Sequence, residues 1–137
     1  SIEEPMADES RTSLTGIIPE GTTAVITGSL VDENGTAISS VSISAMTMTL
    51  YLATTDATII NGRDDTNILN AGPGTVTTGG AVTITLSAAD NDIVSIVEPT
   101  HERHVMLLEW TYSSSGANAK YGKHEVDFQV RAIGKVT

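Results

Sequence analysis

Two of the three histidines could bind a metal ion together, because they stand in the sequence His101-Glu102-Arg103-His104. Histidine and glutamate side chains are common ligands of zinc. On a β-strand, however, residues three positions apart point to opposite faces, so His101 and His104 could share an ion only across a turn. We therefore predict that these histidines, like His124, are exposed or hydrogen-bonded within the protein and hold no metal.

Two acidic clusters could supply oxygen ligands to calcium, namely Asp64-Asp65-Thr66-Asn67 and Asp90-Asn91-Asp92. Calcium needs six or more oxygens in a compact loop, and neither cluster has the spaced carboxylates and closing glutamate of a calcium-binding loop. The Asp and Asn side chains are therefore predicted to cap turns through hydrogen bonds to nearby backbone groups.

A pair of carboxylates could also cleave a glycosidic bond, provided that the two acids face each other across a sugar. Glu109 and Glu125 stand in two runs that are expected to form neighbouring strands. Acids at such positions more often pair with bases across the strands, and Arg103, Lys123 and Arg131 are available. We expect surface ion pairs there rather than a catalytic pair.

Sugar binding without catalysis would need an exposed aromatic platform. The chain has one Trp, three Tyr and one Phe, and Trp110 and Phe128 are expected in the core. An alternative function, as a free carbohydrate-binding or adhesin-type module, would gain support if Tyr51, Tyr112 and Tyr121 lay together on one open face. Scattered or buried tyrosines would instead favour binding to other proteins.

The composition excludes several further classes of protein. The absence of cysteine rules out disulfide scaffolds, zinc fingers, iron–sulfur clusters and thiol catalysis. The 137 residues also contain no His-Glu-x-x-His motif, no nucleophile elbow and no phosphate-binding loop. We therefore predict that the chain is not an enzyme, has no catalytic residues and needs no metal or cofactor.

The charge disfavours nucleic acid as a partner. There are 17 acids against 7 Lys and Arg, a net charge of −10, whereas phosphate backbones are held by basic side chains. The acidic excess lies in residues 1–100, because residues 101–137 are nearly neutral. This asymmetry is either a solvated surface with some clustering or an oriented docking face.

No apolar stretch approaches the roughly 20 residues that span a membrane, so no membrane partner is expected.

Alternation of apolar and polar residues predicts β-strands. Apolar side chains occupy every second position over 82–86 and over 126–132, which gives a strand one buried and one wet face. The same pattern predicts strands over 23–31 and 104–112, and the second of these is expected to be buried on both faces near its start.

The run 41–53 alternates as well, but its apolar face changes parity at Ala45–Met46. A strand cannot exchange its faces without an extra residue. We therefore predict a β-bulge or a break at this point.

Turn signals separate the predicted strands. Asn34-Gly35, Gly72-Pro73-Gly74 and Gly79-Gly80 predict turns or loops, and the stretch 113–122 predicts a long hairpin loop between the last two strands. A short helical turn is expected at Ser87-Ala88-Ala89-Asp90, with the serine as its cap. The spacing indicates an all-β fold, an antiparallel β-sandwich of about seven strands. The helical turn falls before the strand that contains Trp110, which agrees with an immunoglobulin-like sandwich.

Residues 1–21 differ from the rest of the chain. They are acidic and contain few large apolar side chains, with Leu14, Ile17 and Ile18 appearing only near their end. We predict an N-terminal arm over residues 1–21, either disordered in solution or ordered on a partner, followed by one sandwich domain over residues 22–137.

Several stretches carry a family resemblance: residues 28–36 (GSLVDENGT), 59–70 (IINGRDDTNILN), 89–94 (ADNDIV), 102–112 (ERHVMLLEWTY) and 122–126 (GKHEV). Over roughly residues 22–137 the chain resembles small virion proteins of tailed bacteriophages, in particular the immunoglobulin-like N-terminal domain of phage baseplate upper proteins. The resemblance brings no catalytic or ligand residues with it.

The resemblance implies a role in building or decorating a phage particle. Such a protein would be a capsid decoration protein, a head–tail neck protein or a tail or baseplate accessory protein. It would dock in several symmetric copies on other capsid, neck or tail proteins. Its place would be the virion, which is assembled in the host cytoplasm.

Overall fold

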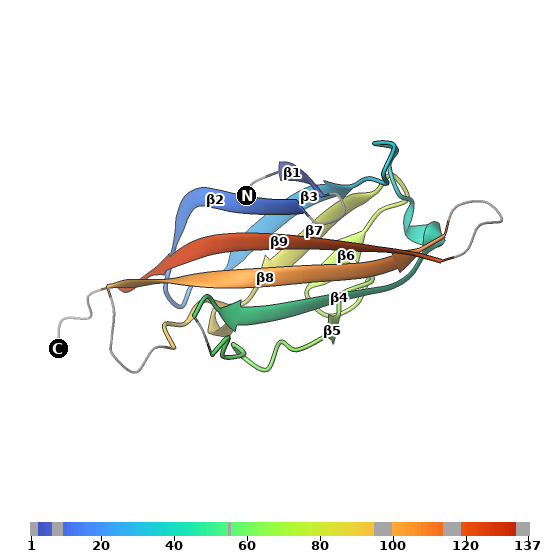
Figure 1. Ribbon diagram of the computed structural model, residues 1–137. Helices are drawn as coiled ribbons and strands as arrows, with labels where there is room; N and C mark the ends of the chain where they lie inside the picture. Colours follow the sequence, from blue (N-terminus) through green and yellow to red (C-terminus); the bar gives the residue numbers. More distant parts are fainter. Residues whose placement is uncertain (1–2, 7–9, 55, 95–99, 114–118, 134–137) are drawn as a thin grey trace.

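The protein is a sandwich of two β-sheets, as the computed structural model shows (Figure 1). The structure describes residues 3–6, 10–54, 56–94, 100–113 and 119–133. Within these ranges the only helical segments are two short 3₁₀ turns, η1 (Ser40–Ser42) and η2 (Ala89–Asn91). Neither of these described turns is long and apolar enough to cross a membrane. The all-β sandwich predicted from the alternation is confirmed.

One sheet has four strands and the other has five. The four-stranded sheet has the order β1 (Glu3–Met6), β3 (Ala24–Leu30), β7 (Ala81–Leu86) and β6 (Gly74–Val76). The five-stranded sheet has the order β2 (Ser10–Pro19), β9 (Lys120–Arg131), β8 (His101–Tyr112), β4 (Ile43–Leu52) and β5 (Thr66–Asn67).

This order of strands is that of an immunoglobulin-like domain. Such a domain has strands A, B, E and D in one sheet and strands C, F and G in the other. Here β3, β7 and β6 take the places of B, E and D, while β4, β8 and β9 take the places of C, F and G. The number of described strands is larger than the predicted seven, because β2 and the two-residue β5 extend the second sheet.

Alternate residues of each strand face the opposite sheet and form the core. In β7, Val82, Ile84 and Leu86 are buried, and in β9 Val126 and Phe128 face the same interior. Removal of these side chains from water is the main favourable term in folding. Both predicted runs of strict alternation are thereby confirmed.

β4 contains the irregularity that the change of parity predicts. Its pairing with β8 shifts register between Ile43 and Ala45, one residue before the predicted position. Ile43 and Met46 are both buried although they stand three positions apart, which an extra residue in the strand allows. β8 is buried on both faces near its start, as predicted, because His104 and Val105 are both inaccessible.

The predicted glycine turns are also present. Val76 pairs with Val82 across the turn at Gly79-Gly80. Gly80 has φ +84°, and a β-carbon there would lie 2.9 Å from the carbonyl oxygen of Ile38, so only glycine fits. At the turn predicted for Asn34-Gly35, the N–H of Gly35 donates to the carbonyl of Asp32.

The last two strands form the predicted hairpin, but the second strand begins earlier than expected. β9 starts at Lys120, and its residues Tyr121 and Gly122 pair with Thr111 and Trp110 of β8. The sequence instead predicts a loop for these two residues, because Gly122 is typical of turns. The loop residues 114–118 lie outside the described part of the chain.

The predicted helical turn forms as η2. The N–H of Ser87 donates to Oδ2 of Asp90 at 2.8 Å, and the N–H of Asp90 donates to Oγ of Ser87 at 3.3 Å. This reciprocal pair of hydrogen bonds is a capping box with aspartate in the usual place of glutamate. Ser87 and Asp90 cap the turn through these bonds, although η2 itself begins at Ala89 and has Ala88 at its N-cap position, one residue after the predicted cap.

Much of the segment predicted as an arm belongs to the sandwich itself. β1 pairs in parallel with β3, and β2 pairs in parallel with β9 (Figure 1). β2 also buries Leu14 in the core. The structure therefore differs from the predicted arm over residues 1–21, because backbone pairing holds these strands and needs few large apolar side chains.

Candidate functional site

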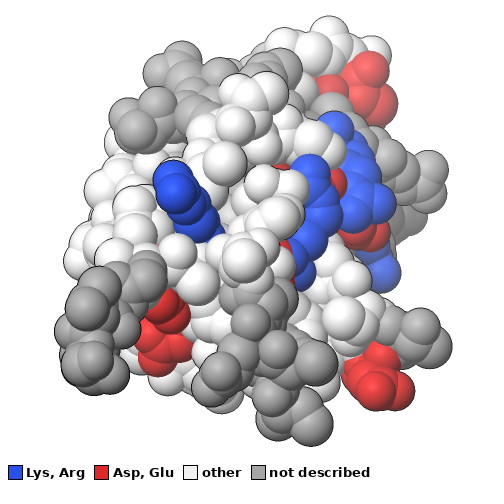
Figure 2. Space-filling model, turned by 90° about the vertical axis from the view of Figure 1, so that its left-hand side faces the viewer, with Lys and Arg blue, Asp and Glu red and all other residues white. Residues whose placement is uncertain are grey.

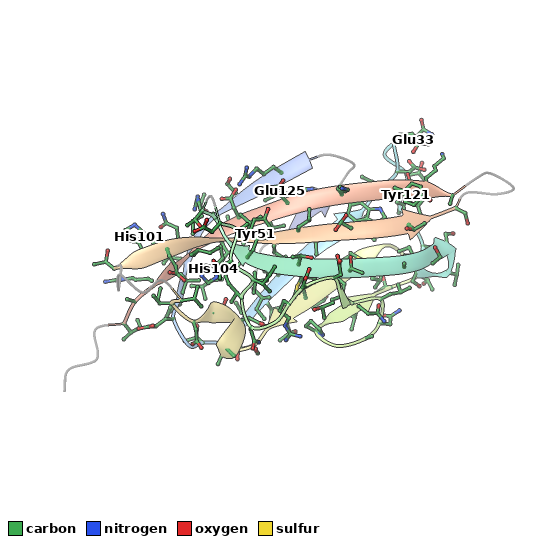
Figure 3. All side chains as sticks on the ribbon, turned by 60° about the horizontal axis from the view of Figure 1, so that its bottom comes forward. Glu33, Tyr51, His101, His104, Tyr121 and Glu125 are labelled. Atoms are coloured by element: carbon green, nitrogen blue, oxygen red, sulfur yellow. The ribbon has the colours of Figure 1, made fainter. Side chains whose placement is uncertain are left out.

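The histidines are bonded within the protein or exposed, as predicted. His104 is fully buried, its Nε2 lies 2.8 Å from Oε1 of Glu102, and its ring packs edge-on against Phe128. His101 is exposed, and its Nδ1 lies 3.0 Å from the hydroxyl of Thr100. The two rings occupy different environments (Figure 3). Among the residues that the structure describes, no three His, Asp or Glu side chains converge as a metal site.

The buried pair of Glu102 and His104 anchors the chain that enters β8. Glu102 accepts the N–H of Val94 at 2.8 Å through the same oxygen that faces the imidazole. Burial lowers the pKa of His104, and this effect outweighs the opposite influence of Glu102. The ring is therefore held mainly as the neutral form near neutral pH.

The third histidine is also bonded within the fold. His124 is buried in β9, and its Nε2 lies 2.8 Å from the hydroxyl of Thr12 in β2. This contact links the two neighbouring strands through their side chains.

Asp90, a candidate calcium ligand, is fully buried and bonded to the protein's own donors. It accepts hydrogen bonds from Asn61 Nδ2 (2.8 Å), Arg63 Nε (2.9 Å) and the N–H and hydroxyl of Ser87 (2.8 and 3.0 Å). Burial works to raise the pKa of Asp90, but the hydrogen bonds from Arg63, Asn61 and Ser87 outweigh it and hold the pKa below its usual value. The guanidinium of Arg63 supplies the positive charge beside this carboxylate.

In the other acidic cluster, Asn67 caps a turn as predicted, because its Oδ1 accepts the N–H of Leu69 at 3.1 Å. Asp65 is held differently, since its backbone N–H donates to the hydroxyl of Thr49 at 3.0 Å. Both contacts fix the chain around β5.

Glu109 and Glu125 each face a base, as predicted, although one partner differs from the expected set. Glu109 pairs with Lys123, with 3.4 Å between Oε2 and Nζ. Glu125 pairs with Arg11 of β2 at 3.7 Å, a residue that the sequence prediction had placed in the arm. Arg103 pairs instead with Asp127 at 3.1 Å.

Asp127 is the centre of the strongest polar cluster on the five-stranded sheet. It stands on the outward side of β9, yet it is buried, because Arg11 and Ser13 cover it from β2 and Arg103 covers it from β8. Arg11 Nε donates to Oδ2 at 2.8 Å and the hydroxyl of Ser13 donates at 2.9 Å. Burial works to raise the pKa of Asp127, but these two hydrogen bonds and the charge of Arg103 outweigh it and hold the pKa below its usual value.

The tyrosines do not form an aromatic platform. Tyr112 is buried and donates to Oε2 of Glu33 at 3.0 Å. Tyr51 pairs opposite Val105, whereas Tyr121 pairs opposite Thr111, so the two lie towards opposite ends of the sheet (Figure 3). Of the three tyrosines, only Tyr121 is largely exposed, at 71%. The three tyrosines therefore supply no joint stacking surface of the kind that the carbohydrate-binding alternative would need.

The outward surface of the five-stranded sheet carries both basic and acidic side chains. The outward positions of β2, β8 and β9 carry Arg11, Arg103, Lys123 and Arg131, with Glu109, Glu125 and Asp127 between them. Figure 2 shows Lys and Arg side chains gathered on one side of the molecule, with acidic side chains among them. Since Arg11, Lys123 and Arg103 face acids, this surface is a mixed ion-pair layer rather than a positive patch.

The opposite outward surface is free of charge over three strands. No Asp, Glu, Lys or Arg occurs in β3, β7 or β6. We call their outward residues the uncharged face, which consists of Val25, Thr27, Ser29, Thr75, Ala81, Thr83 and Thr85. Thr27 and Thr75 both pair with Thr83, so three threonines stand in a row across the sheet.

The sequence analysis did not single out the uncharged face. The signal was present in the absence of charged residues from 21–31 and 71–89 in a chain of net charge −10. No pattern in the sequence indicates that Arg11 and Ser13 contact Asp127, because both lie more than a hundred residues away from it in the chain. Compared with known proteins, the sequence matches no family model and no curated protein.

Proposed function

We propose that this protein is a non-enzymatic structural component of a tailed-phage virion that acts by docking on other virion proteins. It would serve as a capsid decoration protein, a head–tail neck protein or a tail or baseplate accessory protein. The resemblance of residues 28–36, 59–70 and 102–112 to such proteins supports the virion assignment. The observation that carries the docking step is the uncharged face.

An uncharged sheet face suits a protein partner for a physical reason. Charged side chains lose hydration when an interface forms, and this loss is costly unless each charge finds a partner. The core of protein interfaces is accordingly depleted of charged residues. Thr75, Thr83 and Thr85 offer methyl groups for packing and hydroxyls for hydrogen bonds, with no charge to dehydrate.

The buried polar clusters support a structural role in the same way. Asp90, Asp127 and Glu102 are each bonded to side chains or backbone of neighbouring segments. Networks of this kind stiffen a fold. A rigid sandwich can present its faces to several neighbours in a symmetric assembly.

The proposal is tested on virions of a phage that encodes this chain. Mass spectrometry and electron cryo-microscopy of purified particles should find the chain at a fixed copy number that matches a symmetry of the particle. Replacement of Thr83 and Thr85 by lysine should reduce incorporation at least tenfold, because two charges would then be buried in the interface. The matched control is Thr47→Lys on the outward face of the other sheet, which should be incorporated normally.

Absence of the chain from purified virions would overturn the proposal. Normal incorporation of the Thr83→Lys, Thr85→Lys double variant would overturn the assignment of docking to the uncharged face. Circular dichroism of each variant must show the native β-sheet spectrum, so that loss of incorporation cannot be attributed to unfolding.

A further inference from the structure

A groove opens between β2 and β3, where the second half of β2 lies beside the start of β3. Its volume is about 650 Å³, a size within the range of peptide and ligand sites. Its walls include Leu14, Ile17 and Ile18 from β2 and Ala24 and Ile26 from β3. No charged side chain is among the residues that line it.

The β3 wall of the groove has an edge with which no strand of the described residues pairs. β1 pairs only with Thr27–Leu30, so no described strand lies beside Ala24–Ile26 on that side. In an antiparallel pair, successive residues point their N–H and C=O groups alternately toward and away from the partner strand. The N–H of Leu30 donates to Gly80 on the β7 side, so the backbone groups of Val25 point away from β7 and into the open edge.

The β2 wall is irregular at the same level. Its pairing with β9 shifts register between Ser13 and Ile17, and Ile17 is left 53% exposed. Gly16, within this irregular stretch, has no atom within 4 Å of the place where a β-carbon would lie. The groove is therefore open at Gly16 and walled by apolar side chains around it.

We propose that this groove receives an extended segment of a neighbouring protein, which adds to the four-stranded sheet beside Val25 as a new strand. Strand addition of this type takes its affinity from backbone hydrogen bonds and its specificity from pockets for alternate side chains. Residues of the incoming strand opposite Ala24 and Ile26 would point into the groove, so these positions must be apolar. The inference rests on the proposed function, since it describes the chemistry of a docking partner.

Acidic residues at one end of the groove indicate which charge the incoming segment should carry there. Glu20 follows the lining residue Pro19, and Asp92 lies against Gly21 at the same end of the groove. With a net charge of −10 for the chain, an acidic segment would be repelled and a basic flank would be attracted. The expected ligand is thus an apolar–x–apolar strand with Lys or Arg beside it and no acidic residue.

The test uses the purified full chain and a capped heptapeptide of sequence Lys-Val-Thr-Val-Thr-Val-Lys as the probe. Isothermal titration should give saturable binding, and hydrogen exchange followed by NMR should show at least tenfold slower exchange of the Val25 amide. Gly16→Phe, which fills the groove where there is room for a side chain, should weaken binding at least tenfold. Val25→Pro, which removes the N–H without breaking a bond to β7, should do the same.

Two controls identify strand addition. Gly79→Phe places the same side chain at a glycine with only ordinary contacts outside the groove, and it should leave the affinity unchanged. A heptapeptide with N-methyl groups on the amides that would face Val25 keeps its side chains but should lose binding.

Several outcomes would overturn the inference. These are no saturable binding up to millimolar peptide, equal binding of the N-methylated peptide, or full affinity in Gly16→Phe. Binding that emerges only after removal of residues 1–2 would also overturn it, because the chain itself would then be the groove's occupant. Each of these results leaves the proposed function intact if Thr83→Lys, Thr85→Lys still blocks incorporation into virions, whereas absence from virions overturns the proposed function whatever the peptide does.

Discussion

The indole ring of Trp110 lies directly against the backbone of Gly122, its partner in the β8–β9 pair. A β-carbon at Gly122 would stand 2.3 Å from Cε2 and 2.4 Å from Nε1 of the indole. Such distances are far below van der Waals contact, so the ring occupies the space that any other residue would need. The largest side chain of the core thus depends on the smallest residue of the neighbouring strand.

Replacement of Gly122 by alanine should therefore destabilise the protein by about 1–3 kcal/mol, since overpacking forces a ring or a strand to move. Urea unfolding followed by the fluorescence of the single Trp measures this loss. Gly79→Ala is the control, because the nearest atom to its β-carbon would be Thr77 Oγ1 at an ordinary 3.8 Å. Equal stability of both variants would contradict the steric account.

Asp90→Asn should cost about 3 kcal/mol, because it removes the charge that Arg63 and Asn61 face in a buried cluster. Thermal or denaturant unfolding gives the difference directly. The matched control is Asp92→Asn, two positions along the chain and exposed, which should change stability by less than about 0.5 kcal/mol.

Asp127→Asn should weaken the attachment of β2 to β9, since Arg11 and Ser13 both donate to this carboxylate. We expect a loss of about 1–3 kcal/mol together with faster amide exchange in β2. Glu125→Gln removes the longer and more exposed pair with Arg11 and should cost at most about 1 kcal/mol. A larger loss from Glu125→Gln than from Asp127→Asn would show that the cluster is centred elsewhere.

Acid should destabilise the protein through the same two aspartates. The pKa values of Asp90 and Asp127 are lowered in the folded protein, so the unfolded chain binds protons more readily than the folded one. Their contribution is complete above about pH 4, the ordinary value for aspartate, and is lost as the pH falls through the lower folded values. Unfolding free energies between pH 2.5 and 6 should fall with acid, and Asp90→Asn should flatten the curve.

His104 should add a second pH dependence at higher pH. Burial lowers its pKa in the folded protein below the model-peptide value of about 6.5, so stability should decline as the pH falls below that value. NMR titration of the imidazole should show a midpoint below 6.5. His104→Gln should remove the decline between about pH 6.5 and 5, and a decline that persists in this variant would assign it to another group.

Much of the fold follows from short-range patterns in the sequence. The alternation around Ile84 and Phe128 predicts their strands, and the parity change at Ala45–Met46 predicts the bulge to within one residue. The pair of Ser87 and Asp90 predicts the turn that it caps. Each of these features is decided by residues a few positions apart, which the sequence displays directly.

Features that depend on distant residues could not be predicted in this way. Asp127 sits at an outward position of its strand, and only the arrival of Arg11 from the other end of the chain buries it. The large aliphatic side chains of β2, Leu14, Ile17 and Ile18, do not alternate regularly, because the pairing with β9 shifts register between Ser13 and Ile17, so this pairing leaves no periodic signal. The groove and the uncharged face likewise arise from the placement of strands rather than from a motif.

The parallel pairing of β2 with β9 sets an order of events during synthesis. Ser13 and Asp127, which meet in the finished sheet, are separated by 114 residues, and the ribosome needs about 6–23 seconds to make that length of chain. During that time β2 lacks its only neighbour in the described sheet, β9, while β3, β4 and β7 are made in turn. β2 can therefore take its place in the sheet only after β9 has been made, and a neighbouring protein that meets the chain before then would encounter β2 with both of its edges free.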